Sequence, residues 1–175
     1  ALIVLLGFLY WSQKLRRLNL QLATANAQLQ EITLRDPLTG LHNRKYLNER
    51  ISEVFSLCQR NGLRFSIAMI DIDHFKDLND RYGHPFGDVC LQQIGAILAQ
   101  HFQRDSDAVA RYGGEEFIVF LSADSESEFH AHLERLRQQI EAQVLALDGV
   151  TAHVTVSMGG YSAIPRQNDR HDEFV

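Results

Sequence analysis

The sequence predicts an α+β domain in which helices flank a mainly antiparallel sheet, preceded by a long amino-terminal helix. Two observations lead to this prediction. Apolar residues recur at heptad spacing over residues 15–32, and after residue 36 the pattern switches repeatedly between the helical and the strand period. With 175 residues, of which 45% are apolar, the chain can form one compact domain with an extension.

The first residues are strongly apolar. Residues 1–11 read ALIVLLGFLYW and carry no charge, and Lys14, Arg16 and Arg17 follow them. A membrane-spanning helix needs about 20 apolar residues, and positive residues mark a cytoplasmic flank. Because the chain also starts without Met, we expect residues 1–11 to be the end of a transmembrane helix whose start has been removed. A buried amphipathic segment is the alternative.

Residues 12–35 form the next segment. Its apolar side chains are spaced alternately three and four residues apart, at Leu15, Leu18, Leu22, Ala25, Leu29 and Ile32. This spacing is typical of the a and d positions of a coiled coil, and neither Gly nor Pro interrupts it before Pro37. We therefore expect a straight signalling helix that pairs with a second copy of itself. A lone helix that packs on its own domain is the alternative.

Residues 36–175 are expected to fold as one domain, after Pro37 and Gly40 end the helix in a turn. Asn43 is an N-cap candidate, and apolar spacing predicts a helix after it. The same kind of spacing predicts further helices over residues 75–82, 89–102 and 126–147. Strands are predicted over residues 65–72, 109–112, 117–121 and 151–157. The Gly-Gly-Glu-Glu run at residues 113–116 joins two of these strands as a hairpin. The order α-β-α-α-β-β-α-β predicts helices over one face of the sheet.

Composition and motifs exclude several functions. The net charge of −5 argues against a nucleic-acid binder, which would carry a basic face. The sequence lacks the phosphate loop GxxxxGK[S/T], the dinucleotide fingerprint GxGxxG and the nucleophile elbow GxSxG. His130 and His132 lie on a predicted helix and point to different faces, so a zinc site there is not expected. Cys58 and Cys90 lack metal-binding spacing, and we expect both to be buried and reduced.

Carboxylates at the ends of strands are the remaining candidates for chemistry. Asp71 and Asp73 close the first predicted strand, and Glu115 and Glu116 lie at the tip of the hairpin. If the hairpin lies beside that strand, Asp71 and Glu115 converge. Two carboxylates with open positions suit Mg²⁺, which keeps water and substrate phosphate as its other ligands. Taken singly, each feature has a plainer explanation as turn or capping chemistry.

Three longer strings identify the region. They are DPLTGLHNR at residues 36–44, DIDHFKDLNDRYGHPFGD at residues 71–88, and RYGGEEF at residues 111–117. In this order and spacing the strings resemble the GGDEF family of diguanylate cyclases, in the GGEEF spelling of the family signature. The resemblance covers residues 36–164. It implies a palm-like sheet that is similar to the sheet of nucleotidyl cyclases.

The resemblance also implies roles for single residues. It implies that Mg²⁺, or Mn²⁺, is held by the side chains of Asp71 and Glu115 and by the backbone carbonyl of Ile72. Glu115 is expected to assist deprotonation of the attacking 3′-hydroxyl. For GTP, the resemblance implies that Asn79 and Asp88 read the guanine base. It implies that Leu41 lines the base pocket, with His84 nearby, and that the backbone at Phe75 and Lys76 contacts the phosphates. An ionised Asp only accepts hydrogen bonds, so Asp88 suits the N1–H and N2–H donors of guanine.

The implied reaction condenses two GTP molecules to cyclic di-GMP and releases pyrophosphate. Each domain holds one GTP, so the two-fold symmetric product calls for a homodimer. In the family, the RxxD spacing of Arg104 and Asp107 before the signature marks a site at which product inhibits the enzyme. A surface salt bridge is the alternative for this pair. The expected localisation is the cell inner membrane, with the GGDEF domain in the cytoplasm.

One departure from the family bears on activity. Family members continue past the last strand into a segment that supplies a lysine and an arginine to the phosphates, and this chain ends at Val175 before such a segment. The alternative to a cyclase is a non-catalytic GGDEF module that binds cyclic di-GMP or GTP. The presence of Asp71, Glu115, Asn79 and Asp88 favours the cyclase. A purely structural dimerisation module would leave these side chains without a role.

Overall fold

The computed structural model describes residues 11–19, 34–104, 107–121 and 125–170, and the chain divides into two units between residues 34 and 35. The first unit contributes a helix over residues 11–19, in which Trp11, Leu15 and Leu18 are each more than half exposed. No helix among the described residues is long and apolar enough to cross a membrane. Most of the predicted transmembrane segment, residues 1–10, and the heptad positions from Leu22 to Ile32 lie outside the described residues.

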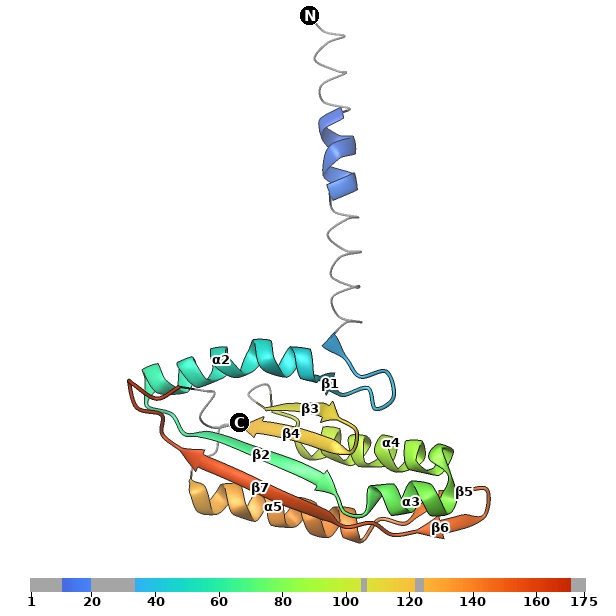
Figure 1. The fold of residues 1–175 in the computed structure, drawn as a ribbon. Coiled ribbons are helices and arrows are strands. Elements are labelled where there is room, and N and C mark those ends of the chain that lie inside the picture. The colour runs from blue at the N-terminus through green and yellow to red at the C-terminus, as the bar shows by residue number, and fades with distance from the viewer. Residues whose placement is uncertain (1–10, 20–33, 105–106, 122–124, 171–175) are drawn as a thin grey trace, which may run out of the picture. The chain divides into compact units, whose positions relative to one another are not determined.

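The second unit is built around a five-stranded sheet with the strand order β1-β3-β4-β2-β7 (Figure 1). The strands are β1 (His42–Asn43), β2 (Phe65–Ile72), β3 (Ala108–Gly113), β4 (Glu116–Leu121) and β7 (Val156–Ala163). Strand β1 runs parallel to β3, and the other neighbouring pairs are antiparallel. The predicted α+β fold with a mainly antiparallel sheet is therefore confirmed.

Helix α2 (Arg44–Asn61) covers one face of the sheet. Its N-cap is Asn43, as the sequence predicts, and the Asn43 side chain accepts a hydrogen bond from the Tyr46 backbone N–H at 3.1 Å. Its C-cap is Gly62, which has a left-handed φ of 62°. The buried side chains of α2 pack on alternate residues of the strands, and this core contains Leu47, Ile51, Phe55, Cys58, Phe65, Ile67, Ala108, Ala110, Ile118 and Phe120.

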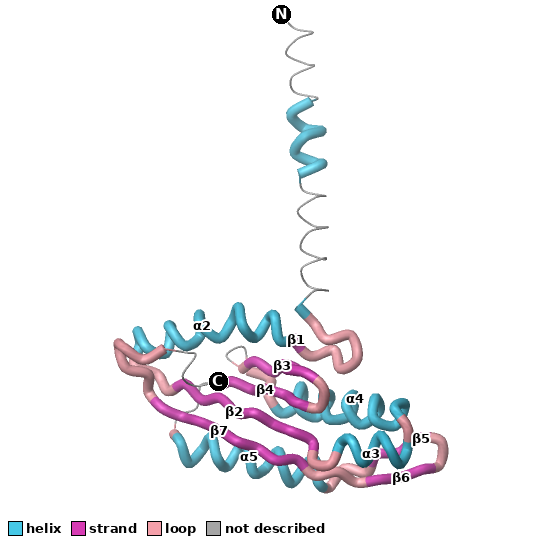
Figure 2. Tube along the Cα trace, viewed as in Figure 1, coloured by secondary structure: helices cyan, strands magenta, loops and turns pink. Residues whose placement is uncertain are grey.

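Helices α4 (His84–His101) and α5 (Glu126–Glu141) cover the opposite face, and the short helix α3 (Phe75–Tyr82) packs against α4 (Figure 2). The core on this side includes Ala68, Ile70, Ile94, Leu98, Phe117, Val119, Phe129 and Leu136. The prediction of helices over one face was therefore wrong, and helices cover both. The reason is that β2 and β4 are apolar on both sides, so each side needs a covering layer.

Three predicted boundaries were also wrong. Helix α4 begins at His84 rather than at residue 89, with proline in its first turn. Helix α5 ends at Glu141 rather than at residue 147, because β5 (Leu145–Leu147) and β6 (Val150–Ala152) form a separate hairpin. The two residues of its turn, Asp148 and Gly149, have left-handed φ values of 50° and 81°. The last strand of the main sheet spans residues 156–163 rather than 151–157.

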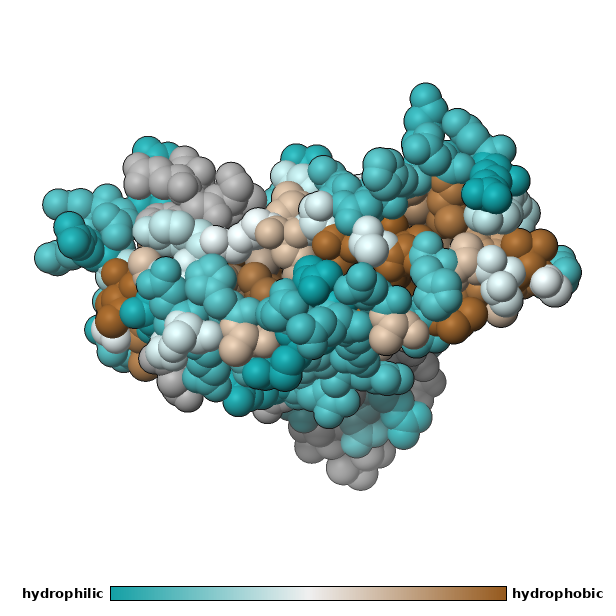
Figure 3. All heavy atoms as spheres, turned by 90° about the horizontal axis from the view of Figure 1, so that it is seen from below, coloured by the Kyte–Doolittle hydropathy of each residue, from teal (hydrophilic) through white to brown (hydrophobic). Residues whose placement is uncertain are grey.

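Burial follows the expected division between apolar core and polar surface. Cys58 and Cys90 are buried and form no disulfide. Burial raises the pKa of the Cys90 thiol to about 12, which keeps it protonated and unreactive. Seen from the α5 side, the surface is mostly hydrophilic, with its larger apolar areas toward the end that carries β5 and β6 (Figure 3). Val144 and Val150 are among the exposed apolar residues.

Candidate active site

Four carboxylates interact where β2 ends beside the β3–β4 hairpin. In the strand ladder, Asp71 lies opposite Glu116 of β4, and Glu115 directly precedes that strand. Burial raises the pKa of Asp71, and the negative charges of Glu115, Glu116 and Asp73 raise it further. The structure therefore brings Asp71 and Glu115 into one electrostatic cluster, as the hairpin interpretation predicted.

This carboxylate cluster fits a divalent cation. Within the described part of the chain, no side chain donates a hydrogen bond to or forms an ion pair with Asp71, Glu115 or Glu116. Carboxylates that lie close together without a compensating charge favour a bound cation, because positive charge relieves their mutual repulsion. No group of three or more His, Cys, Asp or Glu side chains at metal-binding distances occurs among the described residues. A cation here would complete its shell with backbone, water and substrate oxygens, as Mg²⁺ commonly does.

Asp73 differs from its neighbour Asp71, although the sequence places both at the same strand end. The Asp73 carboxylate accepts hydrogen bonds from Ser157 Oγ and Thr155 Oγ1, both at 2.6 Å. These hydrogen bonds, that from Ser157 above all, lower the pKa of Asp73. The Asp73 backbone N–H donates to the Thr155 carbonyl at 3.0 Å. Asp73 therefore ties the end of β2 to the segment that enters β7.

Asn79 of α3 lies against Gly87 of α4. A Cβ atom on Gly87 would lie 2.0 Å from Asn79 Oδ1 and 3.2 Å from Phe75 Cζ, so only glycine leaves room for this arrangement. Asn79 Oδ1 is buried, and no described residue donates a hydrogen bond to it. Such an acceptor is costly unless a ligand or water satisfies it. The predicted guanine reader is thus held in place by packing and retains hydrogen-bonding capacity.

The remaining predicted GTP contacts have different environments. Lys76, His84 and Asp88 are exposed, and Phe75 is half-buried at the start of α3. Leu41 is 6% exposed and belongs to the α4–α5 side of the core, so a base-pocket role for it stays a prediction. The chain passes from β2 into α3 through His74, which has a left-handed φ of 57°. This tight turn places the predicted phosphate contacts directly after the carboxylate-bearing strand.

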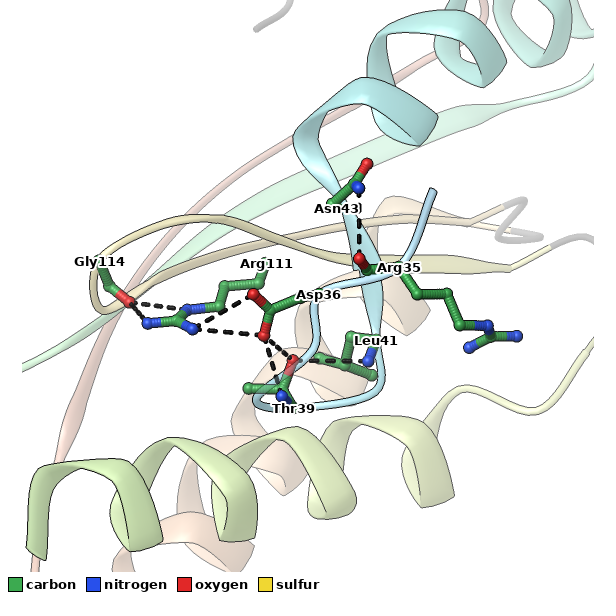
Figure 4. A network of polar contacts seen from close by, with 7 residues as sticks. All are labelled: Arg35, Asp36, Thr39, Leu41, Asn43, Arg111 and Gly114. Atoms are coloured by element: carbon green, nitrogen blue, oxygen red, sulfur yellow. Dashed lines mark hydrogen bonds and ion pairs between the residues drawn. The ribbon is translucent and has the colours of Figure 1, made fainter. Parts of the chain in front are cut away.

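Sequence reasoning missed a polar network that joins two of the quoted strings (Figure 4). Arg111 Nη1 contacts both carboxylate oxygens of Asp36 at 3.3 Å, while Arg111 Nε and Nη2 donate to the Gly114 carbonyl at 2.9 and 2.7 Å. Partial burial acts to raise the pKa of Asp36, but hydrogen bonds from Thr39 and the nearby Arg111 guanidinium outweigh burial and lower it. The only signal in the sequence was that Asp36 and Arg111 are each the first residue of a quoted string.

The predicted product-binding pair lies between α4 and β3. The exposed Arg104 donates its backbone N–H to Asp107 Oδ2 at 3.3 Å, and the Asp107 N–H donates to the Arg104 carbonyl at 2.9 Å. These contacts form a compact turn that keeps the two predicted ligand residues close together. The two intervening residues, 105–106, lie outside the described residues.

Comparison with known proteins gives a consistent result. A family model described as diguanylate cyclase, GGDEF domain, matches residues 33–175. Diguanylate cyclase A of Treponema denticola is 40% identical over 141 residues, covering 79% of this chain and 38% of the relative. Cyclic di-GMP phosphodiesterase NbdA of Pseudomonas aeruginosa is 34% identical over 176 residues, covering 94% of this chain and 22% of the relative. The chain therefore spans less than half the length of either protein.

A solved structure shares the fold. The coiled coil and GGDEF domain of DgcB from Caulobacter crescentus, solved in complex with c-di-GMP, aligns with a TM-score of 0.81 at 25% sequence identity. The alignment covers 88% of this chain and 81% of that chain.

Proposed function

Because this chain belongs to the GGDEF family, we propose that it is the catalytic domain of a diguanylate cyclase, which condenses two GTP molecules to cyclic di-GMP and two pyrophosphates. The observation that carries this proposal is the carboxylate cluster of Asp71 and Glu115, which has no compensating charge among the described side chains. A relative named diguanylate cyclase, 40% identical over most of this chain, supports the same reaction.

The cluster provides for metal binding and proton transfer. Asp71, Glu115 and the Ile72 carbonyl would hold Mg²⁺, or Mn²⁺, and the bound metal would neutralise negative charge on the reacting phosphates. Glu115 accepts the proton of the 3′-hydroxyl of one GTP as that oxygen bonds to the α-phosphorus of the other. The bond from this phosphorus to the pyrophosphate oxygen breaks, and pyrophosphate leaves. A second, equivalent step from the other nucleotide closes the ring.

Guanine selection belongs to α3 and α4 in this proposal. Asp88 is exposed in the first turns of α4, and its carboxylate can accept hydrogen bonds from guanine N1–H and N2–H. Adenine has no hydrogen at N1 and no amino group at C2, so it would leave this acceptor unpaired. Asn79 lies beside Gly87, and Asp88 follows Gly87 in the chain, so this proposal takes the two readers from neighbouring parts of α3 and α4.

The reaction requires two copies of the domain, each with one GTP. We propose that residues 12–35 pair as a coiled coil and that residues 1–11 end a transmembrane helix, with the GGDEF domain on the cytoplasmic side of the inner membrane. The apolar side chains of Leu15 and Leu18 at heptad positions support pairing. The coiled coil in the similar DgcB structure supports it further.

The direct experiment measures cyclic di-GMP and pyrophosphate from GTP and Mg²⁺ with the intact protein. Glu115→Gln and Asp71→Asn should each lower turnover by at least about 100-fold, because each removes charge from the metal site. Both variants should keep the wild-type melting temperature within a few degrees, since neither side chain has a described partner to lose. Glu134→Gln, an exposed glutamate of α5 that pairs with Arg137, is the matched control and should keep full activity. Near-normal turnover by either site variant would refute the metal site.

A module that binds cyclic di-GMP or GTP without producing it is the second candidate. The observation that favours it is the similarity to NbdA, a protein named for phosphodiesterase activity, over 94% of this chain. The same assay separates the two functions. An intact protein that binds nucleotide in calorimetry but releases no pyrophosphate would support the binding module and contradict the cyclase.

A further inference from the structure

We propose that Arg111 is a positioning residue for Glu115, and that it holds the tip of the signature hairpin against the turn over residues 36–41. The inference rests on the proposed function, because it assigns Glu115 the metal and proton-transfer roles. It concerns residues outside the predicted ligand set, since neither Arg111 nor Asp36 was assigned a contact with metal or nucleotide.

The hairpin tip has little else to hold it. A Cβ atom on Gly113 or Gly114 would meet nothing within 4 Å, so the tip makes no close packing contact there. The β3–β4 ladder is irregular between Arg111 and Gly113, and only one pair, Gly113 with Glu116, lies beyond the irregularity, so regular pairing is interrupted just before the tip. Gly114 also has a left-handed φ of 53°, and glycine has many competing conformations. The tip therefore needs a specific restraint to keep one conformation.

Arg111 provides that restraint at the peptide group next to Glu115. Its Nε and Nη2 atoms both donate to the Gly114 carbonyl, at 2.9 and 2.7 Å. Because the peptide group is planar, fixing the Gly114 carbonyl also fixes the direction of the Glu115 N–H. The remaining freedom of Glu115 is its own backbone and side-chain rotation. Loss of the two hydrogen bonds would thus change where the Glu115 carboxylate points.

The remaining guanidinium nitrogen of Arg111, Nη1, is held by Asp36. The two side chains are 16% and 17% exposed, so their ion pair is shielded from solvent far more than an ordinary surface pair. Asp36 is itself held by Thr39, which donates from its backbone N–H at 2.9 Å and from Oγ1 at 2.7 Å. Figure 4 shows the arginine lying between the carboxylate and the hairpin carbonyl.

The turn over residues 36–41 is a suitable anchor because the rest of the domain holds it. The Asp36 N–H donates to the Leu41 carbonyl at 2.8 Å, and the Leu41 side chain is buried in the core. Thr39 lies against Gly95 of α4, where an added Cβ would come 3.0 Å from Thr39 Cβ. The anchor therefore moves with α4 and the core, and the hairpin tip is fixed relative to them through one guanidinium group.

Only arginine can make these contacts together. Its planar guanidinium presents donors in two directions, so it can donate to the Gly114 carbonyl and to the Asp36 carboxylate at once. A lysine at residue 111 keeps the charge and can reach one acceptor, but its compact ammonium cannot reproduce the fork. Arg111→Lys is therefore the sharpest substitution, since it separates positioning from charge.

The test uses the intact protein with Arg111→Lys, Asp36→Asn and the control Arg137→Lys, which changes an exposed arginine of α5 with two ion pairs of its own. Amide hydrogen exchange should become at least about fivefold faster at residues 113–116 in both site variants, without a comparable change in β2 or α5. Turnover should fall roughly 10- to 100-fold in Arg111→Lys, with the KM for GTP within about threefold of wild type. The control should match wild type in both measurements.

Hydrogen exchange and turnover together decide whether Arg111 positions Glu115. Unchanged exchange at residues 113–116 in Arg111→Lys would overturn the inference, whatever the turnover. Faster exchange throughout the domain together with wild-type kcat would mean that the ion pair only stabilises the fold, which also overturns it. An intact wild-type protein without cyclase activity would refute the proposed function instead, and the exchange measurement would still decide whether Arg111 holds the hairpin.

Discussion

Replacing Gly87 with alanine tests whether the contact between α3 and α4 positions Asn79 for guanine. The added Cβ would lie 2.0 Å from Asn79 Oδ1 and 2.9 Å from Asn79 Cγ. Both distances are far below van der Waals contact, so the Asn79 side chain must rotate away from its present place. The Phe75 ring, 3.2 Å from the same point, restricts the directions open to it. The substitution therefore moves the predicted guanine reader without removing any of its atoms.

The expected magnitudes come from two opposing effects on stability and one effect on binding. Overpacking costs about 1–3 kcal/mol, while alanine in place of glycine inside a helix contributes about 1 kcal/mol. The free energy of unfolding should thus fall by no more than about 2 kcal/mol. Loss of a hydrogen bond that leaves a buried partner unsatisfied costs about 1–3 kcal/mol. The KM for GTP should accordingly rise about 5- to 150-fold.

The assay is pyrophosphate release over a range of GTP concentrations, with urea unfolding measured in parallel. Gly160→Ala is the matched control, because its Cβ would lie 2.8 Å from Phe129 Cε1 on the α5 side of the sheet, in a contact that involves no predicted nucleotide ligand. It should destabilise the protein by about 1–3 kcal/mol and leave the KM for GTP unchanged. An unchanged KM in Gly87→Ala would refute the assignment of Asn79 to guanine.

Three further predictions concern other parts of the molecule. Hydrogen bonds lower the pKa of Asp73 in the folded protein, so the stability that Asp73 contributes is present above the unfolded pKa of about 3.9 and is lost as the pH falls through the lower folded pKa. The free energy of unfolding, measured with urea between pH 6 and pH 3, should therefore depend less on pH in Asp73→Asn than in wild type. Calorimetry should show that Arg104→Ala loses most of the wild-type affinity for cyclic di-GMP. Equal affinity in the variant and the wild type would mean that Arg104 and Asp107 only stabilise a surface turn. Removal of residues 1–35 should lower specific turnover at dilute protein but not at high concentration, and concentration-independent turnover would contradict alignment by this helix.

The elements predicted best were those whose ends carry local signals. Strand β2 and helix α3 have the predicted bounds, because an apolar run ends at charged residues and a short helix follows the tight turn at His74. Asn43 caps α2 because its side-chain oxygen reaches the N–H three residues later, which is a purely local geometry. The α4 boundary was missed because Phe86 is the only large apolar side chain in the first turn, too few to show helical spacing, although Pro85 is itself a helix-start signal.

Other features depend on contacts that residue spacing does not reveal. Residues 142–147 retain an apolar pattern compatible with a helix, and this pattern concealed the Asp148–Gly149 turn, which is a strong hairpin signal. The pair of Asp36 and Arg111 spans 75 residues, so only the folded chain shows that they meet. The same holds for the different environments of Asp71 and Asp73, since the partners of Asp73 arrive from 82 and 84 residues further along the chain.

The position of β2 between β4 and β7 has a consequence for how the protein is made. Strand β2 is synthesised before both of its partners, and its Asp71 lies between Glu116 of β4 and Ser157 of β7 in the ladder. Pairings between residues so distant in the chain form late and slowly. While the ribosome is still adding residues before 156, one edge of β2 cannot yet pair with β7. The nascent chain thus completes the surroundings of Asp71 and Asp73 only when β7 docks on β2.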